Sequence, residues 1–155
     1  MSDDVRIVAA TEKDTAIILH MIRGLAEFER LSDHVTATEA ALREQLFGPR
    51  PAAEACLLYV GDEPVGFAVF FHTFSTFASR PGMYLEDLFV VPKFRNRGFG
   101  RQLFAHVAKI GAERGCRTMK WAVLPWNEPA IEFYRRLGAN KVTEWDTFEL
   151  ELARE

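Results

Sequence analysis

The sequence has little that would indicate a metal centre, a disulfide scaffold or a membrane span. Its two cysteines, Cys56 and Cys116, are isolated from each other, and such cysteines are more often small buried hydrophobes than ligands or disulfide partners. The four histidines show no ligand spacing with one another or with cysteine. Apolar runs such as VGFAVFF at 65–71 are far too short to cross a bilayer. We therefore expect no structural metal and no membrane partner.

An excess of charge of either sign is also missing. The 155 residues include 19 cations and 22 anions, so the net charge is −3, and nothing attracts the whole chain to nucleic acid. The start, MSDDVRIVAA, lacks the long apolar stretch of a signal peptide, which predicts a cytoplasmic protein. No linker, repeat or low-complexity segment interrupts the chain, and its length fits one domain over 1–155.

Hydrophobic periodicity predicts a mixed α/β domain whose sheet faces are covered by helices. Thr11 is the expected cap of the first helix, Thr36 and Glu39 form a capping box for the second, and Asn127 caps the fourth. The stretch FSTFASRPG at 74–82 is expected to be a loop. The expected helices are 11–28, 36–48, 98–114 and 127–138, and the expected strands are 5–10, 56–60, 65–73, 83–91, 116–124 and 141–152.

Positive charge gathers in one place, the stretch PKFRNRGFGRQLF at 92–104. It contains Lys93, Arg95, Arg97 and Arg101 together with two glycines, and it follows the apolar run LFVV. A helix N-terminus exposes unpaired N–H groups, and glycines let that backbone approach a phosphate closely. The pattern predicts an anion site. The alternative is a solvated turn whose glycines serve only its geometry.

Two familiar phosphate loops do not fit this stretch. A Walker A loop requires Gly-Lys-Ser/Thr, whereas Gly100 precedes Arg101-Gln102. A dinucleotide fingerprint requires a third glycine, and position 103 is Leu. RNRGFG instead fits the pattern Arg/Gln-x-x-Gly-x-Gly/Ala directly after an apolar strand.

That pattern resembles the pyrophosphate loop of the GNAT superfamily of acyl-CoA-dependent N-acetyltransferases. The resemblance is sharpest in YLEDLFV (84–90), RNRGFG (95–100) and WNEPAIEFYRRLGA (126–139), and it is closest to the spermidine/spermine (diamine) and thialysine acetyltransferase branch. It implies the GNAT fold, in which the strand at 84–91 carries a bulge and splays from the strand at 117–123. It also implies acetyl-CoA as co-substrate, no metal, and a homodimer.

The resemblance implies a set of cofactor-binding residues. Backbone groups of the strand would pair with the pantetheine arm, one N–H would polarise the thioester carbonyl, and the loop would wrap the pyrophosphate. The branch commonly has Gly where this chain has Asn96, but Asn tolerates a left-handed conformation. The expected cofactor residues are Leu88, Phe89, Val90, Arg95, Asn96, Arg97, Gly98, Phe99, Gly100, Arg101 and Asn127.

The resemblance also assigns the catalytic groups. Glu86 is the expected proton acceptor for the amine, acting through water, and its alternative role is that of a solvated carboxylate. Asp87 is adjacent, and neighbouring strand positions face opposite sides, so the two cannot serve one pocket in the same way. Its role is structural or catalytic. Tyr134 is the expected general acid for the departing thiolate, and its alternative is a core aromatic. Transfer would occur by direct attack in a ternary complex.

The acceptor is expected to be the primary amine of a small molecule. Phe28 and Glu29 match an aromatic–Glu pair that contacts polyamine in relatives, and Glu86 would also face the substrate. The stretch 74–82 contains Arg80 and no carboxylate, unlike the polyamine enzymes, so a diamine or a thialysine-like amino acid fits at least as well as a polyamine. The alternatives are a protein N-terminal or lysine acetyltransferase, and a non-catalytic acyl-CoA-binding module.

Overall fold

The computed structural model describes residues 4–152 and divides the chain into two units, residues 1–122 and 123–155. The expectation of a single domain over 1–155 stays a prediction. The first unit holds the sheet with three helices, α1 (Thr15–Phe28), α2 (Glu39–Phe47) and α3 (Phe99–Glu113), and the second holds α4 (Glu128–Arg136). Within the described residues, no helix is long and apolar enough to span a bilayer.

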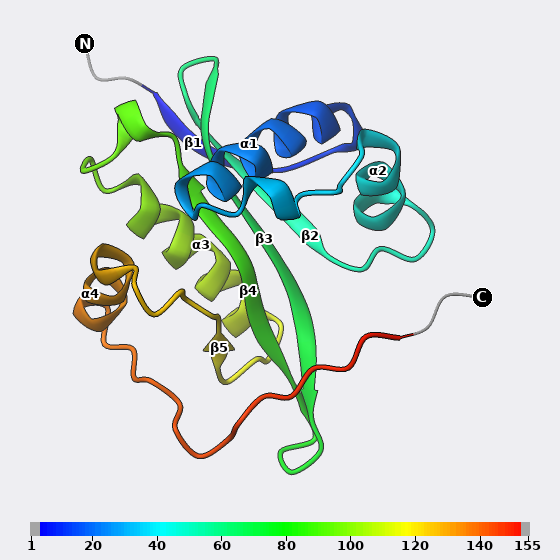
Figure 1. Ribbon diagram of the computed structural model, residues 1–155, viewed down its shortest axis with the longest axis vertical. Coiled ribbons are helices and arrows are strands. Elements are labelled where there is room, and N and C mark those ends of the chain that lie inside the picture. The colour runs from blue at the N-terminus through cyan, green and yellow to red at the C-terminus, as the bar shows by residue number, and fades with distance from the viewer. Residues whose placement is uncertain (1–3, 153–155) are drawn as a thin grey trace. The chain divides into compact units, whose positions relative to one another are not determined.

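The described part of the first unit is built on a mixed sheet with the strand order β1-β2-β3-β4-β5 (Figure 1). Neighbouring strands pair antiparallel, except β4 and β5, which are parallel. β3 and β4 extend together as a long two-stranded ribbon. The strands are β1 (Val5–Ala9), β2 (Glu54–Val60), β3 (Glu63–Ser75), β4 (Arg80–Val90) and β5 (Met119–Lys120).

Each face of the sheet has its own hydrophobic core. Alternate residues of a strand point to opposite faces, so Leu57 packs with α1 (Thr15–Phe28) and α2 (Glu39–Phe47), while Leu58 packs with α3 (Phe99–Glu113). Both leucines are fully buried. The predicted α/β fold, with helices on both faces of a mixed sheet, is confirmed.

A β-bulge interrupts β4 at Glu86. Val69 of β3 pairs with Asp87, but the next residue, Phe70, pairs with Leu85, so Glu86 has no opposite residue. The extra residue changes which side chains face which core. Leu85 lies in the core under α3, whereas Phe89 lies in the core under α1. In an unbroken strand both would face the same side.

β4 and β5 separate soon after they meet. Their register joins only Met83 with Met119 and Tyr84 with Lys120, so from Leu85 to Val90 this edge of β4 has no strand neighbour within residues 4–122. Both the bulge and the splay that the resemblance implied are present. The open edge leaves backbone N–H and C=O groups available to a ligand.

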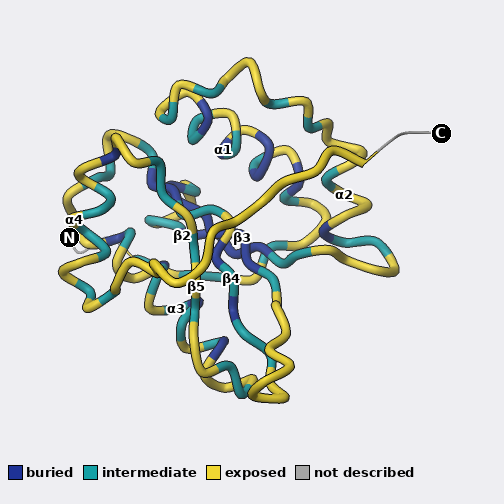
Figure 2. The backbone as a smooth tube through the Cα atoms, turned by 60° about the horizontal axis from the view of Figure 1, so that its bottom comes forward, coloured by how far each residue is buried: buried dark blue, intermediate teal, exposed yellow. Residues whose placement is uncertain are grey.

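Two predicted strands differ from the structure. The strand expected at 116–124 is reduced to Met119–Lys120, and the one expected at 141–152 is not formed. Alternating apolar residues give the right side-chain spacing for a strand, but a strand also needs backbone pairing with a neighbour, and 141–152 makes no such pairing within the described residues. Trp145, Phe148 and Leu150 are exposed there (Figure 2).

The predicted loop at 74–82 is largely strand, because β3 continues to Ser75 and β4 starts at Arg80. Only a short turn remains, and Ser79 adopts a left-handed conformation in it, with φ 54°. The serines, glycine and proline of this stretch suggested a longer loop, but the long ribbon extends beyond the packed helices and keeps its backbone pairing.

The helix caps differ in part from those expected. Thr38, not Thr36, caps α2, because its Oγ1 accepts from the Ala41 N–H at 3.1 Å. Thr11 caps a short 3₁₀ helix, Glu12–Asp14, that precedes α1. Asn127 caps α4 (Glu128–Arg136) as predicted, since its Oδ1 accepts from the Ala130 N–H at 3.3 Å.

Candidate active site

The turn between β4 and α3 forms a backbone cradle. Asn96 and Gly98 both adopt left-handed conformations, with φ 63° and 82°, so Asn96 takes the conformation expected of it. The first hydrogen bond within α3 runs from the Gln102 N–H to the Gly98 carbonyl at 3.1 Å. The N–H groups that precede it have no acceptor inside the helix. These belong to Phe99, Gly100 and Arg101.

The space at this turn is open. A Cβ added to Gly98 would meet nothing within 4 Å, and no side chain caps the start of α3. Arg97 lies over the Phe94 ring at 5.1 Å, and its side chain is exposed beside the turn. Free N–H groups, the positive end of a 15-residue helix and nearby cations together form a geometry that binds anions.

Arg95 points away from its basic neighbours. Its Nε–H donates to the Val90 carbonyl at 2.9 Å. Its guanidinium lies 4.5 Å from the Phe28 ring centroid and 5.4 Å from that of Phe89. Partial burial lowers the pKa of Arg95. The side chain of Arg95 therefore contacts α1 and the core under α1. Its expected role in binding the cofactor stays a prediction.

The open edge of β4 exposes alternate backbone groups. The Val91 N–H donates to the Val65 carbonyl of β3 at 2.8 Å, whereas the Val90 carbonyl accepts from the Arg95 side chain. Because backbone groups alternate along a strand, those of Leu88 and Val90 face the open edge and those of Phe89 face β3. Of the three residues predicted to contact the pantetheine arm, Leu88 and Val90 therefore direct their backbone groups to the open edge, and Phe89 does not.

Three carboxylates gather where the bulge meets the end of α1. Burial, followed by the charges of Glu86 and Glu29, raises the pKa of Asp87 from its ordinary value of 3.8 to about 7. Burial also raises the pKa of Glu29. The bulge at Glu86 interrupts the regular alternation of β4, and the charge of Glu86 raises the pKa of Asp87, so the two carboxylates are close enough to interact. An acidic group of this kind favours a cationic ligand.

The second unit carries the other two predicted residues. Asn127 is buried and its side chain serves as the N-cap of α4. Tyr134 lies on α4, where its ring forms an edge-to-face pair with Phe133 at 5.3 Å between centroids. The cofactor role of Asn127 and the catalytic role of Tyr134 stay predictions.

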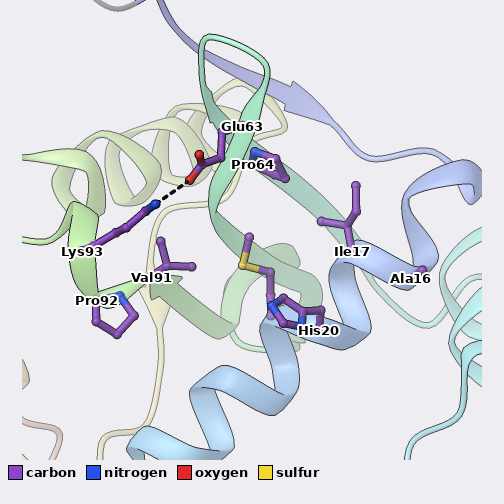
Figure 3. Close-up of a pocket in the computed structure, with 9 residues that line it drawn as sticks. Ala16, Ile17, His20, Glu63, Pro64, Val91, Pro92 and Lys93 are labelled. Atoms are coloured by element: carbon purple, nitrogen blue, oxygen red, sulfur yellow. Dashed lines mark ion pairs between the residues drawn. The ribbon is translucent and has the colours of Figure 1, made fainter.

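A pocket of about 650 Å³ lies between α1, the β2–β3 turn and the end of β4 (Figure 3). The Lys93–Glu63 ion pair, 3.8 Å long, lies at its rim. None of the predicted cofactor, catalytic or substrate residues lines it. Its lining residues are Ala16, Ile17, His20, Met21, Glu63, Pro64, Val91, Pro92 and Lys93. Among the described residues, no group of three or more His, Cys, Asp or Glu could hold a metal.

Sequence reasoning missed two features of this region. It did not foresee the burial of Asp87, because the bulge at Glu86 decides which face Asp87 takes. It also did not foresee that Arg95 contacts Phe28. The adjacent acids in YLED were a sequence signal for the unusual environment of Asp87. No sequence pattern links Arg95 with Phe28, which is far away along the chain.

The splayed strands and the N–H cradle at α3 are the arrangement that the resemblance to the GNAT superfamily implied. The family description "Acetyltransferase (GNAT) family" matches residues 19–139, so the chain belongs to the GNAT acetyltransferase family.

Named relatives agree with that assignment. The thialysine N-epsilon-acetyltransferase of Sus scrofa is 39% identical over 95% of this chain and 92% of its own length. The L-ornithine N5-acetyltransferase NATA1 of Arabidopsis thaliana is 30% identical over 90% and 81%. A solved integron cassette protein from the mobile metagenome of V. cholerae superposes with a TM-score of 0.77 at 26% identity, covering 97% of this chain and 93% of its own. The predicted likeness to the spermidine/spermine (diamine) and thialysine acetyltransferase branch is confirmed.

The raised pKa of Asp87 makes the stability of the protein depend on pH. Native Asp87 keeps its proton up to about pH 7, whereas the unfolded side chain loses it near its ordinary value of 3.8. The stabilising contribution is therefore complete below pH 3.8 and is lost as the pH rises to about 7. Asp87→Asn removes this loss, so the variant should be more stable than the wild type at pH 8, with a smaller difference at pH 4. Urea unfolding across this range measures it, and a difference independent of pH would contradict the pKa shift.

Proposed function

We propose that the enzyme transfers the acetyl group of acetyl-CoA to a primary amine of a small molecule in a ternary complex. The observation that carries the proposal is the open N–H cradle at α3 beside the free edge of β4. Coenzyme A has an anionic pyrophosphate and an amide-rich arm, and these two features suit a helix N-terminus and an unpaired strand edge respectively. Asn96 to Arg101 would hold the pyrophosphate, and Leu88 and Val90 the arm.

The amine would bind at the acidic group formed by Glu29, Glu86 and Asp87, next to the half-exposed ring of Phe28. Carboxylates and an aromatic face suit an ammonium group. The ammonium must lose a proton before its nitrogen attacks the thioester carbonyl. Glu86 would accept that proton through water, and Asp87, with its pKa of about 7, lies beside it in the range where a base works efficiently at neutral pH.

The names of two relatives narrow the choice of acceptor. Thialysine and ornithine are amino acids that carry a side-chain amine, and proteins named for acetylating them are similar to this chain over most of its length. The stretch 74–82 also lacks the carboxylate of the polyamine enzymes. Both observations favour an amino acid or a short diamine over a polyamine. A cytoplasmic location stays a prediction from the sequence.

A thiol-release assay with acetyl-CoA tests the proposal. The acceptors are thialysine, ornithine, putrescine, spermidine and a peptide with a free N-terminus and a lysine. We expect turnover with thialysine or ornithine to exceed that with the peptide. Faster turnover of the peptide would indicate a protein acetyltransferase, and binding of acetyl-CoA without release for any acceptor would indicate a non-catalytic module.

Gly98→Val should weaken acetyl-CoA binding much more than amine binding, because the new side chain would occupy the open space at the cradle. Gly115→Val is a matched control. Gly115 has nearly the same left-handed backbone, φ 85° against 82°, and it also has open space, but it lies at the other end of α3. Both variants should lose similar stability in urea unfolding. Calorimetry should show weaker acetyl-CoA binding for Gly98→Val alone, and equal affinities would remove the turn from the cofactor site.

Tyr134→Phe should lower turnover by about 10²–10⁴-fold if Tyr134 returns the proton to the coenzyme A thiolate. The change keeps the ring that pairs with Phe133, so α4 should stay folded. Both Michaelis constants should change little, since the proton is needed only as the thiolate departs. The loss should shrink with a donor whose leaving thiol is more acidic. If Tyr134→Phe turns over at the wild-type rate while chemistry is shown to limit the rate, Tyr134 is only a packing residue.

We further propose a homodimer that uses the segment 141–152. In the monomer this segment exposes Trp145, Phe148, Leu150 and Leu152, each at least three-quarters accessible to solvent. Large apolar surface of this kind is typical of interfaces. Sedimentation should give twice the chain mass of 17.6 kDa, and Phe148→Ser combined with Leu150→Ser should shift the protein toward the monomer. A wild-type monomer at micromolar concentration would contradict the proposal.

A further inference from the structure

Arg95 stands in the turn expected to bind phosphate, but its side chain contacts the opposite part of the proposed site. Its guanidinium is 4.5 Å from the ring of Phe28, the last residue of α1, and 5.4 Å from the ring of Phe89. Its Nε–H is anchored on the Val90 carbonyl at 2.9 Å. Three contacts thus hold Arg95 between the end of β4 and the end of α1.

No carboxylate balances this cation. Among the described residues, none lies within ion-pair distance of Arg95, although Lys93 and Arg114 in the same unit both have such partners. A planar guanidinium is weakly hydrated and stacks well on aromatic rings, so it can remain against Phe28 and Phe89 without a counter-ion. The contact is specific to the shape of arginine as well as to its charge.

The end of α1 is where the proposed acceptor residues lie. Glu29 follows Phe28 directly, and its N–H still bonds to the Leu25 carbonyl at 2.9 Å. The next residue, Arg30, leaves the helix in a left-handed conformation, with φ 62°. A contact that holds the Phe28 ring in place therefore also holds Glu29 in position relative to Asp87. The two carboxyl groups are close enough for the charge of Glu29 to raise the pKa of Asp87.

We propose that Arg95 is a positioning residue for the amine acceptor: it clamps Phe28 and Glu29 of α1 to the end of β4 and so links the cofactor turn to the acceptor site. This role rests on the proposed function. It differs from the role of a phosphate-binding arginine, which would contact acetyl-CoA directly. One arginine would then couple the two substrates' sites through a contact that neither substrate makes.

Two substitutions separate these roles. Arg95→Lys keeps the charge that a phosphate needs, but it lacks the planar group and the Nε–H that hold Phe28 and Val90. Arg95→Gln removes the charge as well. We expect both to raise the Michaelis constant for the amine by ~3–30-fold, the range of a partly buried cation–π contact. The dissociation constant of acetyl-CoA, measured by calorimetry, should stay within about twofold for Arg95→Lys.

Arg97→Gln is the matched control. Arg97 is in the same turn, but its guanidinium lies over Phe94 and not over a residue of α1. Its loss should weaken acetyl-CoA binding and leave the Michaelis constant for the amine nearly unchanged. If Arg95→Lys keeps the wild-type amine constant, or if the Arg95 variants weaken only acetyl-CoA binding as Arg97→Gln does, the clamp is overturned.

Amide hydrogen exchange gives a readout that does not depend on catalysis. Exchange of residues 25–31 should accelerate in Arg95→Gln and stay at the wild-type rate in Arg97→Gln, with circular dichroism showing that both variants are folded. Unchanged exchange in Arg95→Gln overturns the clamp even if the enzyme is active. Faster exchange in a protein that acetylates no amine would support the clamp and refute the proposed function, so the two failures are distinguishable.

Discussion

The candidate site depends on one extra residue, the bulge at Glu86 in β4. Before the bulge, Met83 and Leu85 face the core under α3, and after it Phe89 faces the core under α1. The change of face brings Asp87 to the side of the sheet where α1 ends and Glu29 lies. A bulge also increases the local twist of a strand, which agrees with the early separation of β4 from β5. A regular strand would direct Asp87 toward the packed core under α3, on the side of Met83 and Leu85.

The sequence predicted most of the architecture because that architecture rests on local signals. Apolar periodicity indicated each helix. Asparagine is a preferred N-cap and tolerates a left-handed backbone, so the capping of α4 by Asn127 and the conformation of Asn96 could both be predicted from the residue type. Strand pairing was less predictable, because it depends on a partner. The pattern at 141–152 alternates like a strand, yet the segment is unpaired in the described chain and its apolar side chains are exposed.

The contacts that define the site could not be read from the sequence, since they join residues far apart along the chain. Asp87 owes its raised pKa first to burial and then to Glu86 and Glu29, and only the fold brings Glu29 near. Arg95 looked like one of four equivalent cations in a basic turn. Its environment separates it from the others, because a carbonyl and two aromatic rings fix its side chain on the α1 side.

The end of β4 thus lies between a basic region, at the start of α3, and an acidic region, at the end of α1. The proposed anionic cofactor would need positive potential, which the start of α3 and the exposed Arg97 would supply. The proposed cationic acceptor would need negative potential, which the carboxylates of Glu29, Glu86 and Asp87 would supply. If these groups were mixed, their charges would neutralise one another as ion pairs, but among the described residues no ion pair joins the acids to the basic turn. Arg95 reaches from the basic turn to Phe28 at the end of α1, where it contacts aromatic rings and not carboxylates, so the acids would remain available to an ammonium group.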